Sequence, residues 1–156
     1  MFGRNSPRGA RVTAAILVMA ALGSLSLSAQ GTKADWGIVI KKKDITAVAK
    51  FYPYTVNGMP MEIFAVRASD GTIRTALNTC QVCYQSGRGY YKQEGNVFVC
   101  QNCGNRFSLD QIEKIKGGCN PVPILPGEKT DLGDSIGVSK AYLASVAPYF
   151  ARWKKS

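Results

Sequence analysis

The segment Cys80-Gln-Val-Cys83 is followed, after sixteen intervening residues, by Cys100-Gln-Asn-Cys103. These two segments are called the first and the second cysteine pair. A Cys-x-x-Cys segment forms a tight turn, and two such turns that face each other place four thiolates around one metal ion. The spacing therefore predicts a four-cysteine metal site, with Cys80, Cys83, Cys100 and Cys103 as its ligands.

Two other uses of the cysteine pairs stay open at the level of sequence. In an oxidising compartment each pair can close into a disulfide, although the odd total of five cysteines fits a pure disulfide framework poorly. A thiol-disulfide redox protein also carries a Cys-x-x-Cys segment, but there it normally begins a helix within an α/β sheet. The chain contains no histidine, which excludes histidine as a metal ligand or a general base.

Short strands separated by turn signals surround both pairs. Asn57-Gly58 is a strong hairpin signal because both residues accept positive φ. Glu94-Gly95-Asn96 marks a second hairpin, which ends at the second cysteine pair. The expected strands are 37–40, 51–56, 61–66, 72–76, 90–92 and 97–99. Each cysteine pair should thus lie just beyond the end of a strand.

Two helices are expected after the cysteine pairs. Ser108 is a candidate cap for a short helix over residues 108–116, which Gly117-Gly118 ends. Ser139 is the candidate cap of a terminal helix that has an apolar face and that Pro148 should kink. The predicted fold class is a mainly β, hairpin-rich single domain with a small α component, a four-cysteine metal knuckle site and a C-terminal helix.

The N-terminal residues have the order of a secretory signal. Arg4, Arg8 and Arg11 precede an uncharged apolar run over residues 12–27, and small residues follow. We expect residues 1–29 to be a cleaved signal peptide or an uncleaved membrane anchor. Residues 30–156 then form a single metal-binding domain outside the cytoplasm, either periplasmic or at the cell surface.

The chain is basic, with a formal net charge of +10. This excess suits either a solvated surface or a docking face for an acidic partner or an anionic membrane surface. Nucleic acid is not an expected partner, because an exported chain seldom meets it and no nucleic-acid motif is present. No carboxylate pair or catalytic motif predicts an enzyme, so redox chemistry at metal or sulfur is the limit of the expected activity.

The fifth cysteine, Cys119, lies in Gly117-Gly-Cys-Asn-Pro-Val-Pro123. Glycines permit close approach of the backbone, and prolines fix the course of the chain. We therefore expect this loop to cover the metal centre, with Cys119 as the residue that contacts the cofactor. Three roles stay open for Cys119: a further ligand, a sulfur near the centre, or a buried thiol.

These segments together carry a family resemblance. The matching segments are Cys80-Gln-Val-Cys83-Tyr84, Gly89-Tyr90, Gln93-Glu94-Gly95, Val99-Cys-Gln-Asn-Cys-Gly-Asn-Arg-Phe107 and Gly117-Gly-Cys-Asn-Pro-Val-Pro123. Over residues 49–124 the chain resembles the FtrD-like family of membrane-associated iron-sulfur proteins. The resemblance implies an iron-sulfur or iron centre that serves electron transfer or metal handling in iron uptake. It also implies membrane iron-permease or redox components as partners.

The order of the motifs is also similar to that of Rieske domains. A Rieske centre needs two histidines on one iron, so any cluster in this chain would be held by thiolates alone and have a lower potential. Spacing does not distinguish an iron-sulfur cluster, a single iron ion and zinc, since all accept four thiolates. The alternative function is therefore a binding module with a purely structural zinc site.

Overall fold

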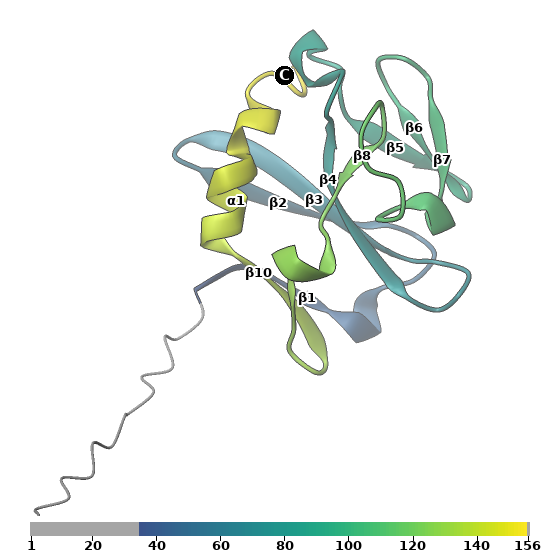
Figure 1. Cartoon of the computed structure of the whole chain (residues 1–156), viewed down its shortest axis with the longest axis vertical. Coiled ribbons are helices and arrows are strands. Elements are labelled where there is room, and N and C mark those ends of the chain that lie inside the picture. Colours follow the sequence, from purple (N-terminus) through teal and green to yellow (C-terminus); the bar gives the residue numbers. More distant parts are fainter. Residues whose placement is uncertain (1–34, 156) are drawn as a thin grey trace, which may run out of the picture. The chain divides into compact units, whose positions relative to one another are not determined.

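The computed structural model describes residues 35–155, and Figure 1 shows them as a β-rich body with one helix along its side. Residues 1–29, the expected signal peptide or membrane anchor, lie outside the described residues, so that expectation stays a prediction. Within the described part of the chain, no helix combines the length and the apolar character that crossing a bilayer requires.

A four-stranded antiparallel sheet leads to the first cysteine pair. Its strands are β2 (Lys50–Val56), β3 (Met59–Arg67), β4 (Ile73–Cys80) and β8 (Pro121–Pro123), in the order β2-β3-β4-β8. Asn57 and Gly58 turn β2 into β3 with φ values of 48° and 80°, as the hairpin signal predicts. Strand β4 ends at Cys80, which pairs with Pro121 of β8. The sheet therefore brings the segment after Cys119 beside the first cysteine pair.

A three-stranded sheet leads to the second cysteine pair. Its strands are β5 (Tyr91–Glu94), β6 (Val97–Cys100) and β7 (Arg106–Ser108), in the order β5-β6-β7. Gly95 has a φ of 59° in the turn between β5 and β6. Phe98 of β6 stacks on Phe64 of β3 with ring centroids 4.3 Å apart. This contact joins the two sheets.

A third sheet closes the fold with strands from far apart in the sequence. Its strands are β1 (Trp36–Lys41), β9 (Thr130–Asp131) and β10 (Ser135–Ser139), in the order β1-β10-β9. Helix α1 (Lys140–Val146) follows directly, and Ser139 caps it by accepting a hydrogen bond from the Tyr142 amide at 3.1 Å. The helix continues as a 3-10 turn over Ala147–Phe150, because Pro148 lacks the N–H that an α-helix needs. The expected C-terminal helix is therefore present.

The prediction of a helix over residues 108–116 is wrong. The described chain has other 3-10 turns at Lys42–Asp44, Tyr84–Ser86, Leu109–Gln111 and Pro126–Glu128. Only the turn Leu109–Gln111 falls in the expected helix, where the Ser108 amide donates to the Gln111 side chain at 2.7 Å. Glu113 then has a φ of 66°, which no α-helix allows. Its carboxylate instead accepts hydrogen bonds from Thr75 of β4.

Buried side chains lie on both faces of β3 and β4, because successive residues of a strand point to opposite sides. The main core contains Ile40, Ile63, Leu77, Leu143, Phe150 and Trp153, among others. The cysteine-side core contains Phe64, Val66, Ala76, Tyr91, Phe98, Leu109 and Ile112 together with Cys80, Cys83 and Cys100. Residues 35–155 form one compact unit, and the predicted mainly β fold class is confirmed.

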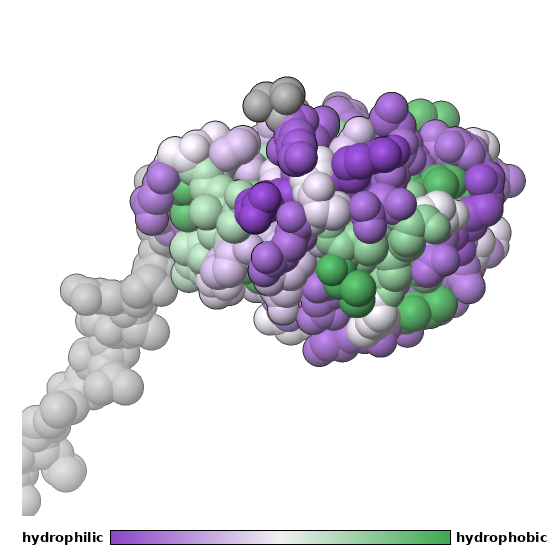
Figure 2. Space-filling view, turned by 90° about the horizontal axis from the view of Figure 1, so that it is seen from above, coloured by the Kyte–Doolittle hydropathy of each residue, from purple (hydrophilic) through white to green (hydrophobic). Residues whose placement is uncertain are grey.

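The C-terminal segment lies against the loop that follows the first cysteine pair and places basic residues there. The Lys155 amide donates to the Gly87 carbonyl at 2.8 Å, and Arg88 forms a β-bridge with Lys154. The Lys154 ammonium lies 5.1 Å from the centre of the Tyr90 ring. Figure 2 looks onto this end of the molecule from above and shows hydrophilic residues over much of it, with smaller apolar patches between them.

Candidate metal centre

The first cysteine pair forms a buried turn. Cys80 is the last residue of β4, and the Cys83 amide donates to the Cys80 sulfur at 3.3 Å. The Cys80 amide donates in turn to the carbonyl of Gly89 at 2.8 Å. A Cβ at Gly89 would lie only 2.4 Å from the Cys83 carbonyl oxygen, so only glycine fits there. The pair is thus fixed by backbone contacts from the following loop.

The second cysteine pair forms a similar turn, but its second residue lies at the surface. Cys100 ends β6 and is buried, whereas Cys103 is exposed. The Gly104 amide donates to the Cys100 carbonyl and the Cys100 amide to the Asn105 carbonyl, each at 2.9 Å. Gly104 has a φ of 77°, which suits glycine. The turn therefore directs Cys100 inward and leaves Cys103 at the edge.

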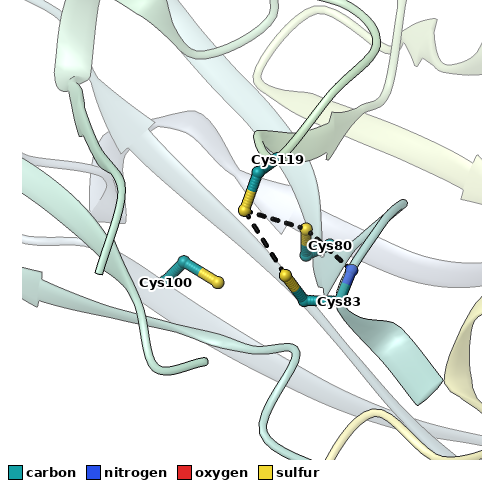
Figure 3. Close-up of side chains that lie close together, drawn as sticks. All are labelled: Cys80, Cys83, Cys100 and Cys119. Atoms are coloured by element: carbon teal, nitrogen blue, oxygen red, sulfur yellow. Dashed lines mark hydrogen bonds between the residues drawn. The ribbon is translucent and has the colours of Figure 1, made fainter. Parts of the chain in front are cut away.

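The loop before β8 adds Cys119 to this group. The Cys119 sulfur lies 3.4 Å from that of Cys80 and 3.5 Å from that of Cys83. Figure 3 shows these three sulfurs together, with the Cys100 sulfur pointing toward them from the other side. The sulfurs of Cys80, Cys83, Cys100 and Cys119 all lie within 4.8 Å of one another.

Cys103 stands outside that group of four sulfurs and yet touches it. Its sulfur lies 2.6 Å from the Cys119 sulfur. The structure thus unites three of the four ligands expected from spacing with Cys119, and it places the fourth at the solvent-exposed edge. All five cysteines are free thiols.

Two buried side chains hold the Cys119 loop in place. The Tyr91 hydroxyl donates to the Cys119 carbonyl at 2.9 Å. The Asn120 amide group donates to the carbonyls of Ile115 at 2.5 Å and Pro121 at 3.1 Å. Sequence reasoning missed these positioning roles. No local sequence signal marks the role of Tyr91, because the carbonyl that accepts from its hydroxyl lies 28 residues away.

Hydrogen bonds within the cluster separate the acidities of its thiols. A hydrogen bond from the Cys100 thiol, supported by the Cys83 amide, lowers the pKa of Cys80 to about 4 against the opposing effect of burial. The same hydrogen bond with Cys80 raises the pKa of Cys100, and burial adds to that rise. One thiolate therefore forms readily, and further negative charge needs a cation to balance it.

The donor set fits a thiophilic metal. Among the described residues, the group that the structure gathers offers sulfur alone, and three of its four members are buried. Thiolates favour zinc, iron and iron-sulfur clusters, whereas magnesium and calcium prefer oxygen ligands. The Cys83 amide directed at the Cys80 sulfur is a further feature of thiolate-metal sites, because such hydrogen bonds tune the ligand sulfur.

The surroundings of the first cysteine pair disfavour a thioredoxin-like redox motif. Such a motif normally begins a helix, but here Cys80 ends a strand and Cys83 precedes the 3-10 turn Tyr84–Ser86. The pair also shares its sulfur contacts with a third cysteine, Cys119. A metal site accounts for this arrangement better than an isolated dithiol does.

Comparison with known proteins agrees with the chemistry of the cysteine cluster. The family model described as membrane iron-sulfur containing protein FtrD-like matches residues 41–150. That span is most of the 156-residue chain and includes all five cysteines. Neither the curated proteins nor the solved structures contain a significant match. The chain, a cysteine-rich metal-binding protein, therefore belongs to the FtrD-like family of membrane iron-sulfur containing proteins.

Proposed function

We propose that the protein holds an iron-sulfur cluster or an iron ion on cysteine thiolates and serves electron transfer or metal handling in a membrane iron-transport system. The observation that carries this proposal is the group of four sulfurs within 4.8 Å of one another in a chain of the FtrD-like family. Cys80, Cys83 and Cys100 supply three ligands, and Cys119 or Cys103 supplies the fourth. The protein is a carrier rather than an enzyme.

Burial and exposure around the cluster suit a redox centre. Cys80, Cys83 and Cys100 are buried, so water is kept from most of the site. Cys103 is exposed and marks the side on which a partner can approach. A centre held by thiolates alone has a lower potential than a histidine-ligated one. When bound, an iron centre would supply the one-electron chemistry, and these residues would hold it and limit its access to solvent.

The proposed location is outside the cytoplasm, periplasmic or at the cell surface. In residues 1–29, basic residues precede an apolar run, and this order supports export with either a cleaved signal peptide or a retained membrane anchor. The membrane designation of the family supports a partner in the membrane, namely an iron permease or redox component. Arg88, Lys154 and Lys155 offer positive charge to an acidic partner or an anionic membrane surface.

A single structural zinc ion is the second candidate, and the sulfur spacing also suits one tetrahedral ion. Four sulfurs at about 2.3 Å from one ion lie about 3.8 Å from each other. The sulfurs here are 3.4 to 3.5 Å apart at Cys119 and at most 4.8 Å apart in the group. Zinc in such a site would make the protein a binding module.

Anaerobic purification of the full chain tests the proposal. Iron, zinc and acid-labile sulfide are measured per chain, and a visible spectrum is recorded before and after dithionite. We expect a coloured protein that contains iron and is reversibly reduced, with sulfide separating a cluster from a single iron. A colourless protein with zinc and no reducible centre would overturn the proposal in favour of the structural zinc module.

A further inference from the structure

We propose that Cys103 and Cys119 form a reversible disulfide in the metal-free protein, and that this disulfide blocks metal loading until it is reduced. The inference goes beyond the proposed function, because it holds whether the centre takes iron or zinc. It assigns a defined chemical role to the one cysteine that lies at the surface.

Of the three sulfur contacts that Cys119 makes, the one with Cys103 is the shortest. The two sulfurs are 2.6 Å apart, compared with 3.4 Å for Cys80–Cys119 and 3.5 Å for Cys83–Cys119. Both residues are free thiols. A small movement of either side chain therefore brings the two sulfurs to bonding distance.

Access to solvent singles out the same pair. Cys103 is exposed and Cys119 is partly exposed, whereas Cys80, Cys83 and Cys100 are buried. Thiol-disulfide exchange requires a thiolate that can reach the disulfide sulfur that it attacks. An oxidant from solution therefore meets Cys103 first, with Cys119 as its nearest neighbour.

Glycine turns beside both residues leave room for the small shift that a new bond needs. Gly117 and Gly118 precede Cys119 with φ values of 86° and 74°, and Gly104 follows Cys103 with a φ of 77°. No other group lies within 4 Å of a Cβ added at any of these glycines, so the turns have open space around them. Cys80 and Cys100, in contrast, end β-strands whose pairing fixes their positions.

Formation of the Cys103–Cys119 disulfide requires an oxidant, and a low-molecular-weight disulfide such as oxidised glutathione can serve as one. The Cys103 thiolate attacks that disulfide, forms a mixed disulfide and releases one reduced thiol. The Cys119 thiolate then attacks the Cys103 sulfur and releases the second reduced thiol. Two electrons and two protons pass from the cysteine pair to the oxidant.

The new bond would leave too few ligands for a four-coordinate site. With Cys103 and Cys119 joined, only Cys80, Cys83 and Cys100 remain as free thiols. A four-cysteine centre cannot then assemble, because a disulfide sulfur is not a thiolate ligand. Metal loading in an oxidising compartment would thus depend on a reductant that opens the Cys103–Cys119 bond.

The test follows wild-type full-length protein that has been stripped of metal by a chelator under anaerobic reducing conditions. After removal of the reductant, oxidised glutathione is added, and samples are quenched with an alkylating agent and mapped by mass spectrometry. We expect the first crosslink to join Cys103 to Cys119. We also expect zinc or ferrous iron uptake to disappear with that crosslink and to return after dithiothreitol.

Unfolding of the metal-free chain would give a different and recognisable result. Loop closure in an unfolded chain favours cysteines that are close in sequence. Early crosslinks within Cys80–Cys83 or Cys100–Cys103 would therefore overturn the proposal, as would no loss of thiols. A Cys103–Cys119 crosslink that leaves metal uptake unchanged would overturn the proposed block of loading.

Two matched variants test the order of the steps. In Cys119→Ser, glutathione should accumulate on Cys103, because the thiol that displaces it is gone. In Cys103→Ser, the early crosslink should disappear and oxidation should slow, because the exposed thiol is gone. The absence of glutathione from Cys103 in a Cys119→Ser protein with a wild-type circular dichroism spectrum would contradict the assignment of Cys103 as the first thiol attacked.

Discussion

The sulfur of Cys119 contacts three other cysteine sulfurs and lies between the two cysteine pairs of the candidate metal centre. Its contacts reach Cys80 and Cys83 of the first pair and Cys103 of the second. Cys103 contacts Cys119 and lies at the surface. The two residues therefore compete for one ligand position, and the contacts of Cys119 with the buried Cys80 and Cys83 favour Cys119.

Serine substitutions distinguish the two candidates for the fourth ligand. Cys119→Ser should lose most of its metal and melt at a lower temperature, because it removes a thiolate that contacts the buried sulfurs of Cys80 and Cys83. Metal binding by thiolate sites contributes about 10 to 16 kcal/mol to folding in small zinc peptides, so the loss should be large. Cys103→Ser should keep most of its metal. Metal per chain and thermal melting provide the measurement, and the reverse order would assign the ligand to Cys103.

Gly89 offers a second prediction at the scale of one residue. In Gly89→Ala the new methyl group would collide with the Cys83 carbonyl 2.4 Å away, and backbone cannot yield as a flexible side chain does. We expect a loss of about 1 to 3 kcal/mol in the free energy of unfolding, together with faster metal release to a chelator. Gly127→Ala is the matched control, since nothing lies within 4 Å there. Equal stability of the two variants would show that the turn is not fixed by this contact.

At the scale of elements, a buried ion pair fastens the segment that carries Cys119. Glu113 lies before Cys119 and Lys129 after it, and the two side chains form an ion pair with exposures of 8% and 13%. The Glu113 carboxylate also accepts hydrogen bonds from the amide and hydroxyl of Thr75 in β4, at 3.0 and 2.6 Å. Both flanks of the Cys119 segment are thereby tied to the strand that ends at Cys80.

Removing one partner of this ion pair should be costly. Glu113→Ala leaves the Lys129 charge nearly buried and unpaired, and breaking such a pair typically costs about 3 to 5 kcal/mol. Chemical denaturation measures the loss, and metal release to a chelator should accelerate because the Cys119 segment loosens. The control is Glu94→Ala, which breaks an exposed pair with Arg106 and should cost less than about 1 kcal/mol. Similar losses in both variants would contradict the structural role of Glu113.

Elements defined by neighbouring residues could be predicted from the sequence, and those that depend on distant partners could not. The Asn57-Gly58 hairpin follows from local turn chemistry and is present. The helix expected after Ser108 is absent because Glu113 turns toward Thr75, 38 residues away. The cysteine spacing likewise indicated the metal site and the loop over it. The exposure of Cys103 and its contact with Cys119 depend on how three separate segments pack, and the cysteine spacing does not predict this packing.

At the scale of the whole molecule, the cysteines belong to only one of the two cores. Cys80, Cys83 and Cys100 lie in the cysteine-side core with Phe64 and Phe98. The main core, formed with β1, β10 and α1, contains no cysteine among its described members. The metal should therefore stabilise one side of the molecule more than the other.

Chelation of the metal should loosen the two sides unequally. Hydrogen exchange followed by mass spectrometry is expected to show faster exchange in β5, β6, β7 and the Cys119 loop. Strands β1 and β10 should keep most of their protection, since their packing does not involve the cysteines. A uniform loss of protection across residues 35–155 would show instead that the two cores unfold as one unit.

The pairing of β1 with β10 has a consequence for the timing of folding. The two strands are separated by residues 42–134, so β1 must wait for its partner until nearly the whole domain has been synthesised. Pairing over such a separation is slow, because the entropy of closing a long loop opposes it before any contact forms. The β5–β6 hairpin closes over a few residues and should form much earlier. In pulse-labelled refolding, amides of β6 should gain protection before those of β1, so a growing chain would assemble its cysteine turns while its first strand is still unpaired.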